Sequence, residues 1–331
     1  MRALRLPKPA LIEQGPLVPV EVSVPEPGPG QILVKVRACG ICHTDLHTVE
    51  GEIVPPAYPI TPGHQVVGTV EAVGAGVSER KVGDRAGVPW LYRTCGVCEF
   101  CRRGEENLCP QAEFTGLHAD GGYAEHMLAD ARFALPLPPG LDDQAAAPLL
   151  CAGIIGYRSL RKADLQPGER LGLVGFGASA HLALQVARAW DCQVCVFTRG
   201  AGHRRLAREL GAFWAGGLEE QAPTPLDRAV LFAPVGKLVP PILEKLRPGG
   251  TLAINAIHST SIPEMPYRLL YGERTLRTVA NATRKDGLEF LDLAAKIPVR
   301  TVTQSYPLDD ANRALLDLKQ GRIDGAGVLL P

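Results

Sequence analysis

Four closely spaced cysteines have the spacing of a metal site. They follow the pattern C-x2-C-x2-C-x7-C at Cys95, Cys98, Cys101 and Cys109. Gly96 and Gly104 permit the tight turns that bring four sulfurs together. The pattern favours a closed, tetrahedral structural zinc site, with four-cysteine iron–sulfur ligation and four unrelated thiols as the alternatives. A closed site has no open position, so we expect it to stabilise its lobe.

A second set of candidate ligands is dispersed along the chain. Cys42 opens the run Cys-His-Thr-Asp-Leu-His, His64 follows a glycine, and Cys151 precedes Ala-Gly. Two thiolates and one imidazole leave a fourth position for water or substrate, which is typical of catalytic zinc. Taken singly, each is a weak signal, because a lone histidine is more often an ordinary core or surface residue than a ligand.

A glycine-rich turn follows an apolar run and precedes a helix-like stretch. It has the pattern G-x-G-x-x-A over Gly175, Phe176, Gly177, Ala178, Ser179 and Ala180. In this context the first glycine permits the turn, the second allows close approach of a pyrophosphate, and Ala180 permits close packing of helix on strand. The pattern predicts a dinucleotide site; the alternative is a plain strand–helix turn.

The end of the next predicted strand bears on the choice of coenzyme. Proteins that bind NAD usually carry an acidic residue there, but this chain has Phe197, Thr198 and Arg199. Arg199 is suited to pair with a 2′-phosphate, with the Thr198 hydroxyl beside it. The residues favour NADP over NAD, and the alternative is a solvated helix start.

Three segments with different patterns must position these residues. Residues 1–144 carry β-branched runs such as 31–36 and 66–73, which predict a mostly antiparallel β domain without a helix of real length. Residues 145–283 alternate predicted strands with helices and favour a doubly wound parallel sheet. The strands are expected at 170–174, 193–197, 229–232 and 251–255, and the helices at 178–190, 204–210 and 238–246. Residues 284–331 contain two helix-like and two strand-like stretches.

Composition excludes several classes of protein. The 331 residues carry no net charge and are 46% hydrophobic, which speaks against nucleic-acid binding and extended disorder. Nine cysteines cannot form a closed set of disulfides. The first residues lack the apolar segment of a secretion signal, and the longest uncharged run, 171–187, is too short and polar to span a membrane. We therefore expect a cytoplasmic protein.

The whole set of motifs, in this order, resembles the zinc-containing alcohol dehydrogenases of the medium-chain dehydrogenase/reductase superfamily. The resemblance covers essentially the whole chain. It implies a GroES-like β domain (1–144) with two zinc sites, a Rossmann dinucleotide-binding domain (145–283) and a C-terminal return to the catalytic domain (284–331). It also implies a homodimer or homotetramer.

The resemblance assigns a role to each candidate residue. Cys42, His64 and Cys151 correspond to the catalytic zinc ligands, and Asp45 to the carboxylate that orients the ligand histidine. Thr44 and His47 correspond to the proton relay. The remaining correspondences are His43 with the pyrophosphate and Trp90 with the wall of the substrate pocket.

The implied reaction is hydride transfer between a primary or secondary alcohol and a nicotinamide coenzyme, reversible to the aldehyde or ketone. Zinc activates the alcohol oxygen as a Lewis acid, and the relay removes its proton. Several positions depart from the family pattern, and two of them lie among the candidate site residues. Gln65 replaces a glutamate after the ligand histidine, and Ile53 replaces a tryptophan, which suggests room for substrates larger than ethanol.

Two alternatives come from other classes. Quinone or enoyl reductases share the fold but generally lack both zinc sites, so the full ligand set argues against them. A non-enzymatic nucleotide-binding redox sensor would need no proton relay, so Thr44 and His47 argue against it.

Overall fold

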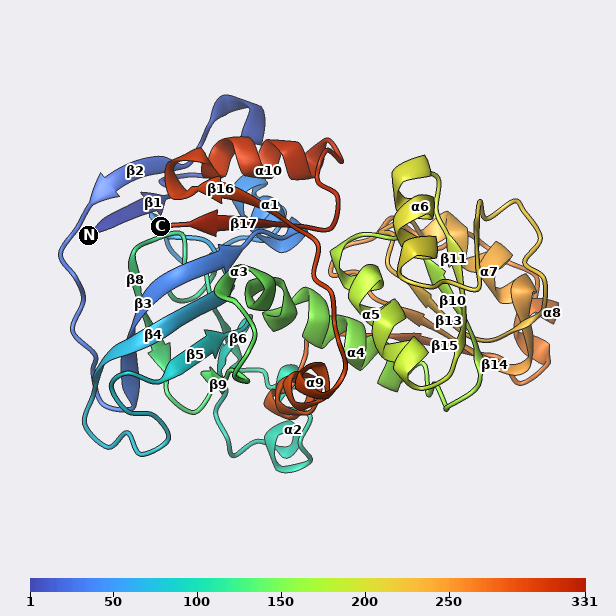
Figure 1. Cartoon of the computed structure of the whole chain (residues 1–331), viewed down its shortest axis with the longest axis horizontal. Helices are drawn as coiled ribbons and strands as arrows, with labels where there is room; N and C mark the ends of the chain where they lie inside the picture. The colour runs from blue at the N-terminus through green and yellow to red at the C-terminus, as the bar shows by residue number, and fades with distance from the viewer. The chain divides into compact units, whose positions relative to one another are not determined.

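The computed structural model describes residues 1–331 and divides them into two compact units. The first unit comprises residues 1–154, 282–296 and 300–331, and the second comprises 155–281 and 297–299. Both termini lie in the first unit (Figure 1). The division follows Ile154, within helix α4 (Ala152–Lys162), whereas the change of sequence pattern lies at 144/145. No helix is long and apolar enough to cross a membrane.

The first unit is built on a seven-stranded sheet in the order β16-β17-β3-β4-β5-β9, with β8 also paired to β3. Its strands are β3 (Gln31–Gly40), β4 (Gln65–Val73), β5 (Arg85–Val88), β8 (His126–Asp130), β9 (Leu135–Pro136), β16 (Thr303–Pro307) and β17 (Ala326–Leu330). Two small sheets pair β1 (Arg2–Arg5) with β2 (Val18–Glu21) and β6 (Leu91–Arg93) with β7 (Glu113–Phe114). All pairings except β16 with β17 are antiparallel, so the predicted antiparallel β domain is confirmed.

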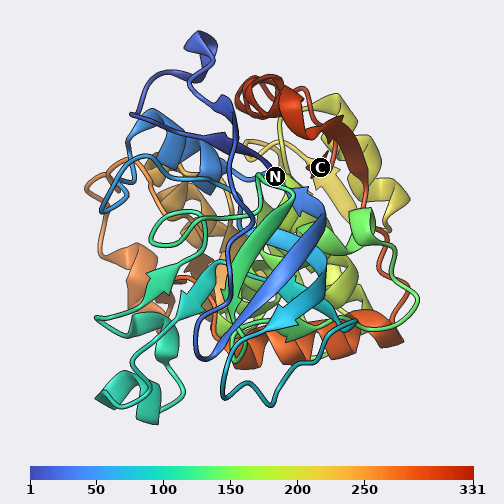
Figure 2. The ribbon, with the colours of Figure 1, turned by 90° about the vertical axis from the view of Figure 1, so that its left-hand side faces the viewer.

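The core of this unit joins segments far apart in sequence. Strand β17 pairs with β3, so the C-terminal segment completes the sheet that the N-terminal segment begins. Helix α10 (Ala311–Lys319) lies along β16 and β17 (Figure 1, and from a second direction in Figure 2). Ala314 and Leu315 of this helix join the same buried cluster as Val34 and Val66 of the central strands. Burying this apolar face holds the C-terminal segment in place.

The expectation of no substantial helix before residue 140 is wrong. Helix α1 (His43–Glu50) occupies eight residues directly after β3. Hydrophobic periodicity misses it because its sequence is largely polar, and its N-terminus is stabilised by a capping box that uses Cys42 and Asp45 instead of the usual Ser or Thr. Short helical turns also occur at η1 (Ile12–Gln14), α2 (Glu99–Arg102), η2 (Glu106–Leu108), α3 (Asp143–Ala146) and η3 (Ala147–Leu150).

The second unit is a six-stranded parallel sheet in the order β12-β11-β10-β13-β14-β15. Its strands are β10 (Arg170–Val174), β11 (Gln193–Phe197), β12 (Trp214–Gly216), β13 (Leu226–Leu231), β14 (Leu246–Ile254) and β15 (Thr275–Thr278). The order is that of a doubly wound dinucleotide-binding sheet, which confirms the predicted fold class. The short strands β12 and β15 lay outside the predicted set.

Helices α5 (Ala178–Ala189) and α7 (Val239–Lys245) pack on this sheet, α5 against β10 and β11, and α7 against β13 and β14. The other helices are α6 (Ala201–Glu209), α8 (Arg268–Tyr271) and the short η4 (Gly236–Leu238). In the first unit, α9 (Arg284–Lys296) and η5 (Leu308–Asp310) complete the set. Observed helix ends lie within a few residues of the predicted ones.

Helix α5 contains a buried histidine that the sequence did not single out. His181 is fully buried, and neither ring nitrogen has a hydrogen-bond partner. Burial lowers the pKa of His181 to about 4, because the charged imidazolium is costly inside the core. The unfolded chain therefore binds one more proton than the folded protein between about pH 6.5 and pH 4.

This difference predicts that His181 makes the protein sensitive to acid. Stability should fall as the pH drops from about 6.5, with a loss that approaches about 3 kcal/mol at pH 4. His181→Leu should remove this contribution, measured by urea unfolding from pH 7.5 to 4.5 in parallel with the parent protein. His258→Leu, at an exposed position, is the control. Parallel pH curves for parent and His181→Leu would contradict the prediction.

Candidate metal centres and coenzyme turn

Two thiols and one imidazole converge in the first unit. The Sγ atoms of Cys42 and Cys151 and a ring nitrogen of His64 lie within 4.8 Å of one another. Cys42 is the N-cap of α1, His64 lies in the loop before β4, and Cys151 follows η3. The structure thus brings together the three residues that the sequence proposed as a ligand set.

Asp45 ties two of these residues together. Its Oδ2 accepts a hydrogen bond from the backbone N–H of Cys42 at 2.9 Å, and its Oδ1 lies 2.8 Å from His64 Nδ1. The backbone N–H of Gly63 also donates to Oδ1, at 3.1 Å. Asp45 is itself buried, so these contacts satisfy its charge and orient the imidazole.

The opposite nitrogen of His64 is the observation that points most directly to a metal site. Nε2 is buried and has no hydrogen-bond partner. An unsatisfied buried nitrogen beside two thiols is costly unless a cation occupies the space between them. The donor set, two sulfurs and one imidazole nitrogen, is one that zinc prefers. The residues therefore fit a zinc ion.

Contacts among Cys42, His64 and Cys151 shift the pKa of each of these residues. The Cys151 thiol and His64 both stabilise the Cys42 thiolate, which holds the pKa of Cys42 well below its usual value. The same contact with Cys42, together with burial, raises the pKa of Cys151. Burial opposes the charge on His64, but Asp45 and Cys42 outweigh it and raise the pKa of His64 to about 10.

The other predicted residues of this segment lie on or near α1. The Thr44 hydroxyl is 3.7 Å from Cys42 Sγ, at the metal end of the helix. His43 is exposed, and its ring centroid lies 6.4 Å from that of His47. His47 Nδ1 lies 2.5 Å from Glu52 Oε2. Gln65 is buried at the start of β4, and its amide oxygen has no partner.

The two predicted pocket residues are both partly exposed. The Trp90 ring meets His64 edge-on at 4.9 Å and stacks on Phe114 at 4.9 Å and 15°. Trp90 therefore lies beside the ligand set, held by an aromatic partner that the sequence did not suggest. The backbone N–H of Ile53 donates to the His47 carbonyl at 3.1 Å.

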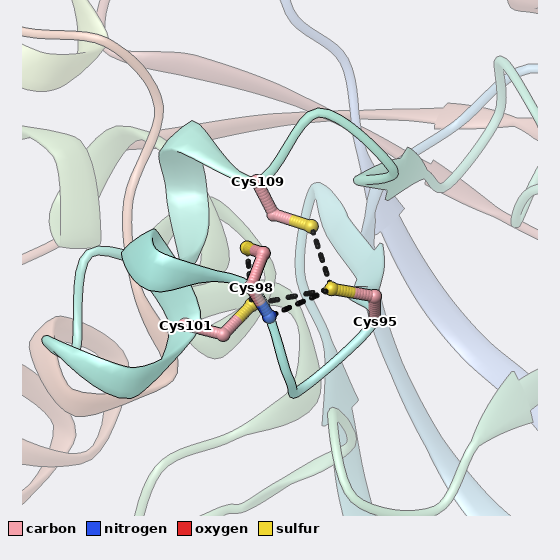
Figure 3. A group of neighbouring side chains, drawn as sticks. All are labelled: Cys95, Cys98, Cys101 and Cys109. Carbon is pink, nitrogen blue, oxygen red and sulfur yellow. Dashed lines mark hydrogen bonds between the residues drawn. The ribbon is translucent and has the colours of Figure 1, made fainter.

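The four remaining candidate ligands form a compact cluster (Figure 3). Cys98 Sγ lies 3.5 Å from Cys101 Sγ, Cys109 Sγ lies 3.5 Å from Cys95 Sγ, and the Cys95 and Cys101 sulfurs are 4.0 Å apart. Four sulfurs at about 2.3 Å from one tetrahedral ion would lie about 3.8 Å apart. None of the nine cysteines forms a disulfide. The spacing fits a single ion.

The backbone around this cluster supports thiolate ligands. The N–H groups of Val97 and Cys98 lower the pKa of Cys95 to about 6, whereas burial raises the pKa of Cys109 to about 11.

The segment that carries the four cysteines is also joined to α9, because Glu106 accepts hydrogen bonds of 2.7–3.1 Å from the backbone and guanidinium of Arg284. This buried carboxylate was not suggested by the sequence, since its partner is far along the chain.

The glycine-rich turn lies between β10 and α5. Gly175 has φ 88°, and a Cβ there would meet the backbone of Ala233 at 3.1 Å. A Cβ on Gly177, the N-cap of α5, would face open space. Phe176 and Ala180 are buried, whereas Ala178 and Ser179 are partly exposed. An open glycine before free helical N–H groups fits a pyrophosphate.

The two residues that directly follow β11 differ in their exposure to solvent. Arg199 is exposed, while Thr198 is buried, and its carbonyl accepts a hydrogen bond from Arg204 Nε at 2.9 Å. No carboxylate follows the strand directly. The Arg199 side chain is therefore accessible to a ligand, and the hydrogen bond from Arg204 stabilises the turn.

Comparison with known proteins decides the family. Residues 28–139 match the Alcohol dehydrogenase GroES-like domain. The chain is 52% identical to the probable alcohol dehydrogenase AdhA of Mycobacterium tuberculosis, over 100% of this chain and 97% of that protein. The chain belongs to the zinc-containing alcohol dehydrogenase family.

Solved structures of the family agree with this assignment. A cinnamyl alcohol dehydrogenase of Sorghum bicolor superposes with a TM-score of 0.91 at 30% identity, covering 99% of this chain and 96% of that one. A cobalt- and zinc-bound thermostable alcohol dehydrogenase of Pyrobaculum aerophilum gives 0.90 at 26% identity, covering 100% and 99%. The chain is therefore an alcohol dehydrogenase.

Proposed function

We propose that this alcohol dehydrogenase depends on zinc, binds two zinc ions per chain, and uses NADP or NAD, with NADP preferred. The environment of His64 is the observation that supports the catalytic zinc site. Asp45 holds one of its nitrogens, and the other is buried without a partner beside two thiols. The substrate class is a primary or secondary alcohol, or the corresponding aldehyde or ketone.

Cys42, His64 and Cys151 would hold the catalytic zinc. A zinc ion there would act as a Lewis acid toward the oxygen of the alcohol or carbonyl. Asp45 keeps His64 in the orientation and tautomer that direct Nε2 to the ion. Gln65, beside His64, keeps a hydrogen-bonding amide where the family usually has a carboxylate.

The proton is handled by residues of α1. The Thr44 hydroxyl, 3.7 Å from Cys42 Sγ, is the group that would accept the alcohol proton. His47, one turn along the helix, would pass it to solvent. Trp90 and Ile53 would bound the pocket, and the smaller Ile53 would admit alcohols larger than ethanol.

Cys95, Cys98, Cys101 and Cys109 would hold the structural zinc. The four sulfurs lie within 4.8 Å of one another, which suits a single ion and leaves no space for the inorganic core of an iron–sulfur cluster. The site is complete with four thiolates, so its role is to stabilise the lobe.

The coenzyme is assigned to the unit that carries the glycine turn. The residues that would receive the pyrophosphate are Gly175, Phe176, Gly177, Ala178, Ser179 and Ala180. The family resemblance separately assigns a phosphate contact to His43. Thr198 and Arg199 would bind the adenosine ribose and its 2′-phosphate. We infer the assembly, a cytoplasmic homodimer or homotetramer, from the resemblance, and native mass spectrometry tests the number of chains.

The coenzyme assignment predicts the effect of removing Arg199. Arg199→Ala should raise the KM for NADP by about tenfold or more, because a charge-assisted hydrogen bond contributes about 1.5–3 kcal/mol. The KM for NAD should change little. Arg205→Ala, on exposed residue Arg205 of α6, is the control. A parent enzyme with a far lower KM for NAD than for NADP would contradict the preference.

The test of the function as a whole is a substrate panel. Purified enzyme should oxidise primary or secondary alcohols, and reduce the matching aldehydes or ketones, with NAD and NADP assayed in parallel. Activity only toward quinones or activated C=C bonds would overturn the proposal.

A further inference from the structure

A carboxylate that the sequence did not suggest contacts the outer end of the proposed proton relay. Glu52 Oε2 lies 2.5 Å from His47 Nδ1, and the side chains are 45% and 18% exposed. We propose that Glu52 is a positioning residue for proton transfer: it holds His47 as the Nδ1–H tautomer, which places the lone pair that accepts the proton on Nε2. The inference rests on the proposed function, since it concerns the relay of that reaction.

The backbone brings Glu52 to this position. The chain leaves α1 through Gly51, whose φ is 83°. The N–H of Gly51 donates to Thr48, and the N–H of Glu52 donates to the carbonyl of His47 at 2.9 Å. This is the Schellman arrangement that ends many helices. It folds Glu52 back over the last turn, so the same residue contacts both the backbone and the ring of His47.

Local packing fixes this turn. A Cβ on Gly51 would lie 2.9 Å from Cβ of Pro9, and its positive φ disfavours any other residue. The turn therefore depends on glycine, and the contact between Glu52 and His47 follows from the way the helix ends.

Two other carboxylates near the end of α1 are paired with groups other than His47. Glu50, also in the last turn, accepts hydrogen bonds from the backbone of Ile12 and from Lys319 of α10. Glu13 of the packed turn η1 also pairs with Lys319. The ring of His43 faces His47 at a centroid distance of 6.4 Å. A cationic imidazole in the last turn is also favoured by the helix dipole.

The proton balance is simple. In the resting state of the proposed relay, His47 carries its proton on Nδ1, donated to Glu52, and its lone pair lies on Nε2. Nε2 takes up the proton released from the alcohol, and the resulting imidazolium is stabilised by the neighbouring carboxylate. The imidazolium then releases that proton to water.

A second histidine–carboxylate pair provides a matched control. His126 Nε2 lies 2.9 Å from Glu71 Oε2, and the side chains are 15% and 39% exposed, close to the values for His47 and Glu52. The contact uses the opposite ring nitrogen and joins β8 to β4. Glu71→Met therefore removes a similar carboxylate from a histidine outside the proposed relay.

The test is the tautomer of His47, read from the ring ¹⁵N shifts of zinc-loaded enzyme labelled in histidine. His47→Gln assigns the signals. In the parent protein, neutral His47 should be mainly Nδ1–H; in Glu52→Met at least half should become Nε2–H, and Glu52→Gln, whose amide oxygen can still accept from Nδ1, should lie between. Glu71→Met should change the tautomer of His126 and leave the tautomer of His47 unchanged. An unchanged His47 tautomer in Glu52→Met would overturn the proposal.

Kinetics complete the test. Glu52→Met should lower kcat for alcohol oxidation about tenfold with little change in coenzyme KM, an effect at the lower end of the roughly 10- to 100-fold losses that follow removal of a residue that orients a metal-ligating histidine. Glu52→Gln should retain part of the kcat that Glu52→Met loses. A tautomer change without loss of kcat would contradict a role in proton transfer. A parent enzyme inactive with every alcohol would contradict the proposed function instead, and the tautomer measurement would still stand.

Discussion

Cys42→Ser should lower kcat/KM for alcohol oxidation by about a thousandfold. The substitution removes one of three proposed ligands, and Cys151 and His64 alone hold an ion poorly. Without the ion, no other group in the set stabilises developing negative charge on the alcohol oxygen, and one such stabilising contact is typically responsible for a factor of about 10² to 10³.

Metal content separates loss of the ion from general damage. The parent enzyme should contain two zinc ions per chain and the Cys42→Ser enzyme about one, because the four-cysteine cluster is untouched. Cys192→Ser, at a buried cysteine outside both clusters, should keep both ions and its activity. Full activity in Cys42→Ser would show that the catalytic assignment is wrong.

Cys109→Ser should have its main effect on stability. The residue closes the four-sulfur cluster from the end of η2, while the other three ligands lie in the preceding loop and α2. Apparent binding free energies of structural zinc in small domains are about 10–16 kcal/mol, so losing the ion should unfold the lobe locally. We expect a lower unfolding temperature and new protease cleavage within residues 95–109, both measured against Cys192→Ser.

The same variant distinguishes a structural from a catalytic metal. At low temperature, chains of Cys109→Ser that remain folded should keep the zinc bound by Cys42, His64 and Cys151, and much of their activity. A variant that keeps its thermal stability and resists protease would contradict the structural role of the cluster.

Regular patterns made much of the fold predictable from the sequence. The β-branched runs at 31–36 and 66–73 lie in β3 and β4, and the alternation after residue 145 gives the parallel sheet. Helix α1 was not predicted, because its polar sequence has almost no hydrophobic period. Its N-terminus is stabilised by the capping box at Cys42. Helix formation of this kind depends on side-chain hydrogen bonds that periodicity does not measure.

The candidate site was predictable in its ligands but not in its supporting contacts. The ligand motifs were visible at Cys42, His64 and the four-cysteine run. The stack of Phe114 on Trp90 and the ion pair of Glu106 with Arg284 join residues from different segments. Such pairings follow from the folded chain, and no local pattern encodes them. Glu52 is close to His47 in sequence, but its contact depends on the left-handed turn at Gly51.

The central claim is that the enzyme needs the zinc held by Cys42, His64 and Cys151. The most direct measurement is the initial rate of reduced coenzyme formation from a reactive alcohol, before removal of metal by a chelator, after removal, and after zinc is restored. We predict an active enzyme, near-complete loss of the rate after removal, and recovery when zinc is returned. A rate that is unchanged when this zinc is absent would contradict the claim.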